Sequence, residues 1–235
     1  QVRTVLVTHC HADHVAELAS LVSFAWSSGR NGGDASRRLD VWGPTGLGDY
    51  EVGMKRSLRR SIADQEGPLA QTPRFDTFAT WHEFTPPQAA RTLVDRAGLE
   101  VRAIRVRHGG MPSVAYRVRT PDLDVAISGD RGVGGDGFDR FAAGADVLVH
   151  EVIDRSLVTG VLEGQGAAPS FIGHLVDDHT DGPDVGRTAT AAGVDTLVLY
   201  HLIPGNPAIT DEAWVELVRP TYAGAIVVAR DLMVL

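Results

Sequence analysis

The sequence predicts a layered α/β protein that forms a single domain over residues 1–235. Apolar, β-branched runs that are typical of buried strands alternate with stretches whose apolar residues recur at helical spacing. In addition, five of the strand-like runs end directly on a histidine, an aspartate or a His-Glu pair. Because layered α/β proteins build their sites at strand ends, this pattern also predicts a functional site.

The N-terminal element is predicted to be a buried strand from Val2 to Thr8 that runs directly into a histidine-rich loop. Helical spacing follows from Val15 to Trp26, and the glycine-rich stretch from Ser27 to Gly33 is expected to end this helix. A short strand is expected from Leu39 to Trp42, before a helix-compatible stretch and a proline-rich region that includes Pro68.

Later strands are predicted to deliver polar side chains at their ends. The alternation from Leu99 to Val106, after Ala97-Gly98, favours a hairpin over a helix continued from Arg91, and its second strand leads to His108. Four more strands are expected over Ser113 to Arg119, Leu123 to Ser128, Ala145 to Val149 and Asp195 to Tyr200. The last three lead to Asp130, to His150 with Glu151, and to His201. Helices are expected from Pro183 to Ala192 and from Thr210 to Arg219.

The composition limits the classes of partner. A formal charge of −8 and a pI near 5.5 disfavour long nucleic acids, whose binding needs clustered Lys and Arg. The stretches Lys55 to Arg60 and Arg102 to Arg107 are interpreted as solvated faces. No run approaches the ~20 apolar residues that span a bilayer, so no membrane partner is expected, whereas a homodimer stays open.

The termini and the single cysteine bear on localisation. Cys10 is the only cysteine, which leaves no intrachain disulfide or cysteine-based zinc cluster and fits a reducing, cytoplasmic compartment. The chain enters at Gln1 directly on a strand-like run, so the natural N-terminus is expected to be missing and export stays open.

The loop after the first strand has the composition of a metal site, because three imidazoles and one carboxylate fall within six residues: His9, His11, Asp13 and His14. Side chains two apart on an extended chain share a face, so His9 and His11 can bind one ion while Asp13 and His14 turn toward another. These nitrogen and oxygen ligands suit Zn²⁺, with Mn²⁺ or Fe as substitutes. An accidental histidine-rich surface is the plainer alternative.

The order of these motifs resembles the metallo-β-lactamase superfamily. The resemblance is carried by HxHxDH from His9 to His14, by His108, by Ser-Gly-Asp ending at Asp130, by His150-Glu151 and by His201. Within that superfamily the chain is similar to the ribonuclease Z and arylsulfatase-like branch, through Leu39 to Pro44, Ala145 to Val152, His179-Thr180 and Ala191 to His201. The resemblance implies a four-layer αββα sandwich, in which the strands that usually precede the first histidine motif are apparently missing.

The resemblance also implies two divalent metal ions, with Zn²⁺ as the first expectation. The expected ligands are His9, His11 and His108 for one ion, Asp13, His14 and His201 for the other, and a bridging Asp130 with a shared hydroxide. His179 corresponds to the proton donor to the leaving group and Glu151 to its orienting partner, while Asp13 is also a candidate to hold or deprotonate the attacking water.

Plainer interpretations stand beside several of these roles. His108 next to Gly109-Gly110 could mark a turn, and Asp130 could belong to an ordinary Asx turn. His150 fits a core imidazole and is left out of the ligand set. His82 and His174 are expected to be surface or structural residues.

The expected function is hydrolysis of a small ester-type substrate: a phosphodiester, a sulfate ester or a carboxylic ester. Bacterial ribonuclease Z enzymes carry an arm for transfer RNA between the third histidine and the bridging aspartate, and only 21 residues, Gly109 to Gly129, lie there in this chain. The alternatives are a lactone or thioester hydrolase of secondary metabolism, a ribonuclease Z-like RNA 3′-end endonuclease, and a non-catalytic metal-binding module. Specificity is expected to lie in loops from Val52 to Pro87 and from Leu157 to Asp178.

Overall fold

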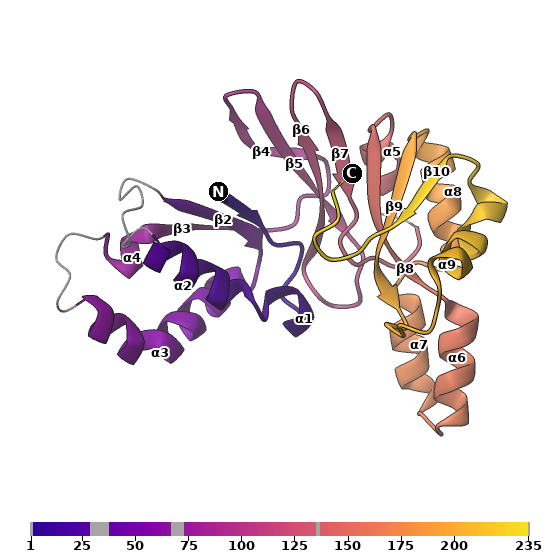
Figure 1. Cartoon of the computed structure of the whole chain (residues 1–235), viewed down its shortest axis with the longest axis horizontal. Helices are drawn as coiled ribbons and strands as arrows, with labels where there is room; N and C mark the ends of the chain where they lie inside the picture. The colour runs from indigo at the N-terminus through magenta and orange to yellow at the C-terminus, as the bar shows by residue number, and fades with distance from the viewer. Residues whose placement is uncertain (1, 29–37, 67–72, 135–136, 235) are drawn as a thin grey trace. The chain divides into compact units, whose positions relative to one another are not determined.

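The computed structural model describes residues 2–28, 38–66, 73–134 and 137–234. The chain divides into two compact units, Gln1–Thr85 and Pro86–Leu235. Within these described ranges, each unit contains one β-sheet, its own helices and its own hydrophobic core (Figure 1). Among the described residues, no helix is both long enough and apolar enough to cross a membrane. The expectation of a single domain over residues 1–235 stays a prediction.

The first unit is built on a parallel three-stranded sheet in the order β1 (Thr4–Leu6), β2 (Leu39–Pro44), β3 (Ala79–Phe84). In β2 the side chains alternate, so that Leu39 and Val41 enter the core while Asp40 and Trp42 lie on the opposite face. The helices α2 (Leu18–Ser28) and α3 (Leu47–Glu66) cover the core side of this sheet (Figure 1). The short helices of the unit are α1 (Ala12–Val15) and α4 (Phe75–Phe78).

The helix α3 occupies a segment that the sequence analysis assigned in part to a pocket loop. Its apolar residues recur every three or four positions and face the core, as in Leu47, Tyr50, Met54, Leu58 and Ile62. The expectation of a loop from Val52 to Pro87 was therefore wrong over the rest of α3, which agrees with the helix-compatible stretch expected there, and it was also wrong over α4 and β3. Residues 67–72, with Pro68, and residues 29–37, with most of the glycine-rich stretch after α2, lie outside the described residues.

The second unit is built on a seven-stranded sheet in the order β10-β9-β8-β7-β6-β5-β4. These strands are β4 (Arg91–Arg96), β5 (Leu99–Val106), β6 (Ser113–Arg119), β7 (Asp124–Ile127), β8 (Val147–Ile153), β9 (Thr196–Ile203) and β10 (Ala225–Val228). The hairpin that was predicted to lead to His108 is confirmed as the antiparallel pair β4-β5. The strands from β7 to β10 pair in parallel.

Strand direction explains how distant residues reach one edge of this sheet. Both β5 and β7 run antiparallel to β6, so they run in the same direction as β8 and β9. The carboxyl ends of these four strands therefore share an edge. His108 and Asp130 follow two of them, and Glu151 and His201 lie near the ends of the other two.

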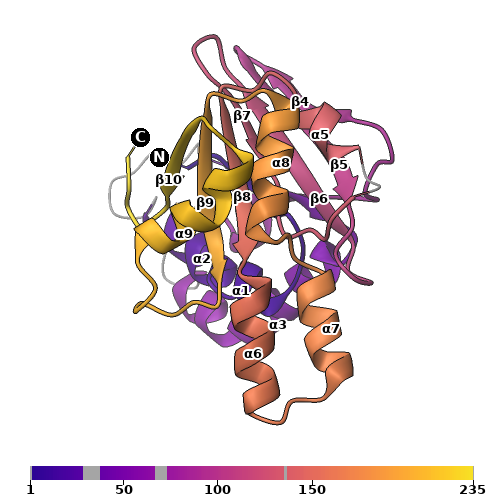
Figure 2. The ribbon, with the colours of Figure 1, turned by 90° about the vertical axis from the view of Figure 1, so that its right-hand side faces the viewer.

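The helices α5 (Phe138–Ala142), α8 (Gly182–Ala192) and α9 (Asp211–Val218) cover one face of the seven-stranded sheet (Figure 2). The expected helices over Pro183 to Ala192 and after Thr210 are confirmed as α8 and α9. Thr210 caps α9 through a hydrogen bond that its Oγ1 accepts from the backbone N–H of Ala213 at 3.4 Å. A 3₁₀ turn, Arg219–Thr221, follows α9.

A helical hairpin extends from this unit between β8 and α8. It consists of α6 (Arg155–Gly164) and α7 (Pro169–Asp177), which pack on each other through Val158, Ile172 and Val176 (Figure 2). Asp154 caps α6 by accepting a hydrogen bond from the backbone N–H of Leu157 at 2.9 Å. The expectation of a loop from Leu157 to Asp178 was therefore wrong, since most of the segment is helical.

Candidate metal centre

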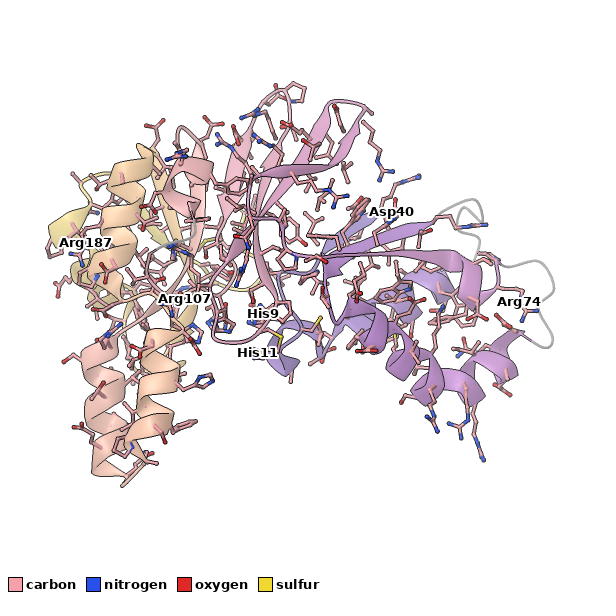
Figure 3. All side chains as sticks on the ribbon, turned by 180° about the vertical axis from the view of Figure 1, so that it is seen from behind. His9, His11, Asp40, Arg74, Arg107 and Arg187 are labelled. Carbon is pink, nitrogen blue, oxygen red and sulfur yellow. The ribbon has the colours of Figure 1, made fainter. Side chains whose placement is uncertain are left out.

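The histidine motif of the first unit begins directly after the parallel strand β1. His11 has an extended backbone, with ψ of 152°, and forms the N-cap of the one-turn helix α1. This turn brings His14 back toward His9, whose ring centroid lies 4.0 Å from that of His14. His9 and His11 lie side by side at the start of the motif (Figure 3).

The spacing of the donor atoms in this motif matches that of ligands on one ion. Two nitrogens that each lie about 2.0–2.1 Å from a tetrahedral Zn²⁺ are about 3.3 Å apart. His9 Nε2 lies 3.2 Å from His11 Nδ1, and His14 Nε2 lies 3.3 Å from Asp13 Oδ2. The chemistry and spacing of these donors fit a divalent metal, and their division between two ions stays a prediction.

The second unit holds another donor set at the edge where its strands end. Asp130 Oδ2 lies 3.4 Å from His201 Nε2 and 3.9 Å from His108 Nε2. Asp130 and His108 are almost completely buried, whereas the side chain of His201 is 22% exposed. One carboxylate oxygen thus faces nitrogens of two histidines, which is an arrangement that suits a ligand shared between two ions.

A backbone carbonyl fixes the tautomer of His108. The backbone carbonyl of Asp178 lies 2.9 Å from His108 Nδ1, so this nitrogen carries the proton and Nε2 keeps its lone pair toward Asp130. Gly109 follows with φ of +50°, and a Cβ at this position would approach Asp178 Oδ2 to 2.7 Å. The positive φ of Gly109 therefore favours glycine in the turn after β5.

His201 owes its orientation to an irregularity in β9. Tyr200 pairs with Glu151 and Leu202 pairs with Val152, so His201 is the additional residue of a β-bulge. Its φ of +48° lies in the left-handed region, which non-glycine residues rarely adopt. Strain of this kind is typical of functional sites.

His179 and Glu151 lie together as the sequence analysis expected. Glu151 Oε2 accepts a hydrogen bond from His179 Nδ1 at 3.2 Å, and Glu151 Oε1 accepts one from the backbone N–H of Thr180 at 2.7 Å. The ring of His179 stacks on that of His201 at 5.5 Å between centroids. His108, Asp130 and His179 each offer a donor atom within 4.8 Å of the others.

Burial and charge act in opposite directions on this pair. Burial alone would lower the pKa of His179, but the hydrogen bond and charge of Glu151, with the charges of Asp130 and Asp178, raise it above its ordinary value. Burial is the main reason that the pKa of Glu151 is raised as well. Both directions favour the protonated forms of the two side chains.

The remaining histidines have structural environments. His150 is fully buried, and its Nδ1 donates to the backbone carbonyl of Glu151 at 2.6 Å. Burial and the charge of Arg131 lower its pKa to about 3, so this imidazole is neutral. His82 stacks on Trp42 at 3.9 Å, and His174 is an exposed residue beside Asp178.

Several residues that support the site carried no signal in the sequence. Thr180 Oγ1 donates to the carbonyl of Arg131 at 2.7 Å, and Ser128 Oγ accepts from the backbone N–H of Glu151 at 3.1 Å. These partners are 23 to 49 residues apart in the chain. Only the two dipeptides His179-Thr180 and Ser128-Gly129 within the family motifs could have pointed to them.

These features define a class of protein: an α/β chain with histidine and aspartate donor sets, suited to divalent metals, at the ends of its strands. Comparison with family models then identifies the family, because the Beta-lactamase superfamily domain matches residues 1–202. The chain belongs to this family and has the metallo-β-lactamase fold that the sequence predicted.

Proteins named ribonuclease Z or tRNase Z are among the relatives that are similar in sequence or in fold. The chain is 29% identical to Ribonuclease Z of Mycobacterium bovis (strain BCG / Pasteur 1173P2), over 97% of this chain and 77% of that protein. Human tRNase Z, short form, has a TM-score of 0.64 with 21% identity and is similar over 99% of this chain and 78% of its own. The metallo-β-lactamase fold protein YhfI from Bacillus subtilis has a TM-score of 0.63 with 19% identity, over 97% of this chain and 75% of its own.

Proposed function

We propose that the chain is a metal-dependent phosphodiesterase of the ribonuclease Z type, with an RNA 3′ end as its substrate. The observation that carries this proposal is Asp130, whose Oδ2 faces the Nε2 atoms of His108 and His201 in a chain related to Ribonuclease Z over nearly its whole length. The relatives favour this RNA alternative over the small ester substrate that the sequence analysis preferred. A phosphodiester bond is present in the RNA substrate and in one of the small ester substrates that the sequence analysis named.

The proposed metal ligands are the donors of both units. The first unit would supply His9, His11, Asp13 and His14, and the second would supply His108, Asp130 and His201. When bound, two divalent cations lower the pKa of a water molecule and neutralise charge on the leaving oxygen. Zn²⁺ is the first expectation for a donor set of nitrogen and carboxylate oxygen, with Mn²⁺ or Fe as alternatives.

Side chains of the second unit would supply the proton that the leaving group needs. Glu151 is fixed by the backbone of Thr180 and holds Nδ1 of His179, which leaves Nε2 of His179 to donate a proton to the departing oxygen. The hydrogen bond and charge of Glu151 raise the pKa of His179, which favours the protonated imidazole that a proton donor needs. Asp13, whose side chain is 64% exposed, is proposed to orient the attacking water.

A small phosphodiester is the second candidate. The residues from Gly109 to Gly129, where an RNA-binding arm would be expected, are occupied largely by the paired strands β6 and β7. The acidic net charge of −8 also works against a polyanionic substrate. These two observations favour a substrate without an extended RNA backbone.

The decisive experiment compares two substrates and two aspartate variants. We expect the purified chain with Zn²⁺ or Mn²⁺ to remove the 3′ trailer from a transfer RNA precursor and to hydrolyse bis(p-nitrophenyl) phosphate more slowly. Asp130→Asn should abolish both activities, whereas Asp122→Asn, in the exposed turn between β6 and β7, should change neither. Cleavage of the small diester alone would support the second candidate. Turnover that survives full chelation would disprove both, as would turnover confined to sulfate, carboxylic, lactone or thioester substrates.

A further inference from the structure

The four-residue connection between α7 and α8, Asp178 to Asp181, carries His179 and is held at several points. His108 Nδ1 binds the carbonyl of Asp178, and Thr180 binds both Glu151 and the carbonyl of Arg131. At its other end, Asp181 Oδ1 accepts a hydrogen bond from the backbone N–H of Arg155 at 3.1 Å. The position of His179 therefore depends on how firmly this connection is fixed.

One of the fixing contacts comes from a residue with no role in the proposed chemistry. The guanidinium of Arg107 donates through one Nη to the carbonyl of Asp177 at 3.2 Å and to the carbonyl of Val133 at 3.3 Å. Asp177 is the last residue of α7, where the helix presents carbonyl groups with partial negative charge. A cation at this place both satisfies a terminal carbonyl and interacts favourably with the helix dipole.

The contact links the end of α7 to the end of β5. Arg107 and His108 are consecutive in the chain, and they bind the consecutive carbonyls of Asp177 and Asp178. The backbone N–H of Gly132 also donates to the carbonyl of Arg107 at 2.8 Å, and a Cβ on Gly132 would come within 2.2 Å of the carbonyl oxygen of Asp177. The three segments meet too closely for any side chain at position 132.

We propose that Arg107 is a positioning residue for the reaction: it fixes the C-terminal end of α7 and thereby holds His179 at the leaving group. This proposal rests on the proposed function, in which His179 donates the proton. A proton donor has to lie within hydrogen-bond reach of the departing oxygen, and small displacements of such groups are costly. Loss of Arg107 should therefore impair proton donation by His179 and leave the proposed metal ligands unchanged.

The test combines kinetics with amide hydrogen exchange on the metal-loaded chain. Arg107→Met should lower kcat about tenfold for a diester with an alkoxide leaving group, at unchanged KM, and should change hydrolysis of bis(p-nitrophenyl) phosphate little, because nitrophenolate needs no proton. Amide exchange of residues 176–181 should rise about tenfold. Arg107→Lys should recover part of both effects, because its ammonium can still reach one carbonyl. The matched control is Arg187→Met, an exposed arginine on α8 that pairs with Asp184 (Figure 3).

Two outcomes would overturn the proposal. An increase in KM for both substrates at constant kcat would show that Arg107 binds the substrate phosphate instead. Unchanged exchange in residues 176–181 would show that the contact does not fix the end of α7. The exchange measurement needs no turnover, so it tests the role of Arg107 even if the chain cleaves neither diester and the proposed function fails.

Discussion

At the scale of single residues, the hydrogen bond between His179 and Glu151 makes a kinetic prediction. His179→Ala should slow a diester with an alkoxide leaving group by about 10²-fold or more, and should slow bis(p-nitrophenyl) phosphate far less. The reason is that only the basic alkoxide requires a proton as it departs. Metal content should stay unchanged, because His179 is not in the proposed ligand set. Arg187→Ala, at an exposed position on α8, is the control. Equal slowing of both substrates would contradict the assignment of His179 as the acid.

At the scale of secondary-structure elements, the strand pair β6-β7 is joined by an ion pair whose effect depends on pH. The carboxylate of Asp124 receives two hydrogen bonds from Arg117, at 2.7 and 2.8 Å, and one from Arg119 at 2.9 Å. Burial alone would raise the pKa of Asp124, but these hydrogen bonds and charges lower it below its ordinary value. Arg117 also binds the carbonyls of Phe141 and Ala143 and so connects the strand pair to the end of α5.

A lowered pKa in the folded state means that folding favours the ionised carboxylate. Its contribution to stability should be complete above the pKa of the unfolded chain, about 4, and should be lost as the pH falls through the lower folded value. Asp124→Asn should therefore lower the free energy of unfolding by about 1–2 kcal/mol at pH 7, and the difference from the wild type should shrink below pH ~4. Denaturant titrations at several pH values measure this, with Asp122→Asn as the control. A difference that persists undiminished at pH ~2 would show that another interaction is responsible.

Some secondary-structure elements could be predicted from the sequence and others could not. The ends of β5 and β7 were predictable because their apolar runs stop shortly before His108 and Asp130, whereas β9 continues past His201 to Ile203. The helix α3 was predicted only as a helix-compatible stretch before the proline-rich region, and its part from Val52 onward was also assigned to a pocket loop. The hairpin α6-α7 was missed because its helices are short and Gly166 and Pro169 interrupt the pattern. The contacts of Arg107 and Thr180 join residues up to 70 positions apart, which no local pattern encodes.

At the scale of the whole molecule, bound metal should contribute to stability as well as to turnover. Clustered imidazoles and carboxylates bind a divalent ion only when folding brings them together, so ions that bind the native chain raise its stability by mass action. At a free concentration of 100 Kd the gain is about 2.7 kcal/mol per site. Chelation should therefore lower the melting temperature, and Zn²⁺ should restore it.

Metal analysis beside the melting curves provides the check. Asp130→Asn should bind less metal and show a smaller shift on chelation than the wild type, whereas Asp122→Asn should match the wild type in both. Loss of all metal with no change in melting temperature would contradict the ligand set. Normal metal binding without turnover on any substrate would favour the non-catalytic binding module.

The helical hairpin between β8 and α8 begins just after Glu151 and ends just before His179. Its base is tied down on both sides: the backbone N–H of Asp154 binds the carbonyl of Ile203 at 2.8 Å, and Arg155 reaches the carbonyl of Val176 at 3.0 Å. The tip, around Gly166, lies at the far end, where an added Cβ would meet nothing within 4 Å. The two helices of the hairpin can therefore change in length at the tip without a change at the base. A lineage could lengthen or replace these helices to recruit a new partner while Glu151 and His179 keep their hydrogen bond, and a fluorescent domain grafted at the tip would use the same tolerance.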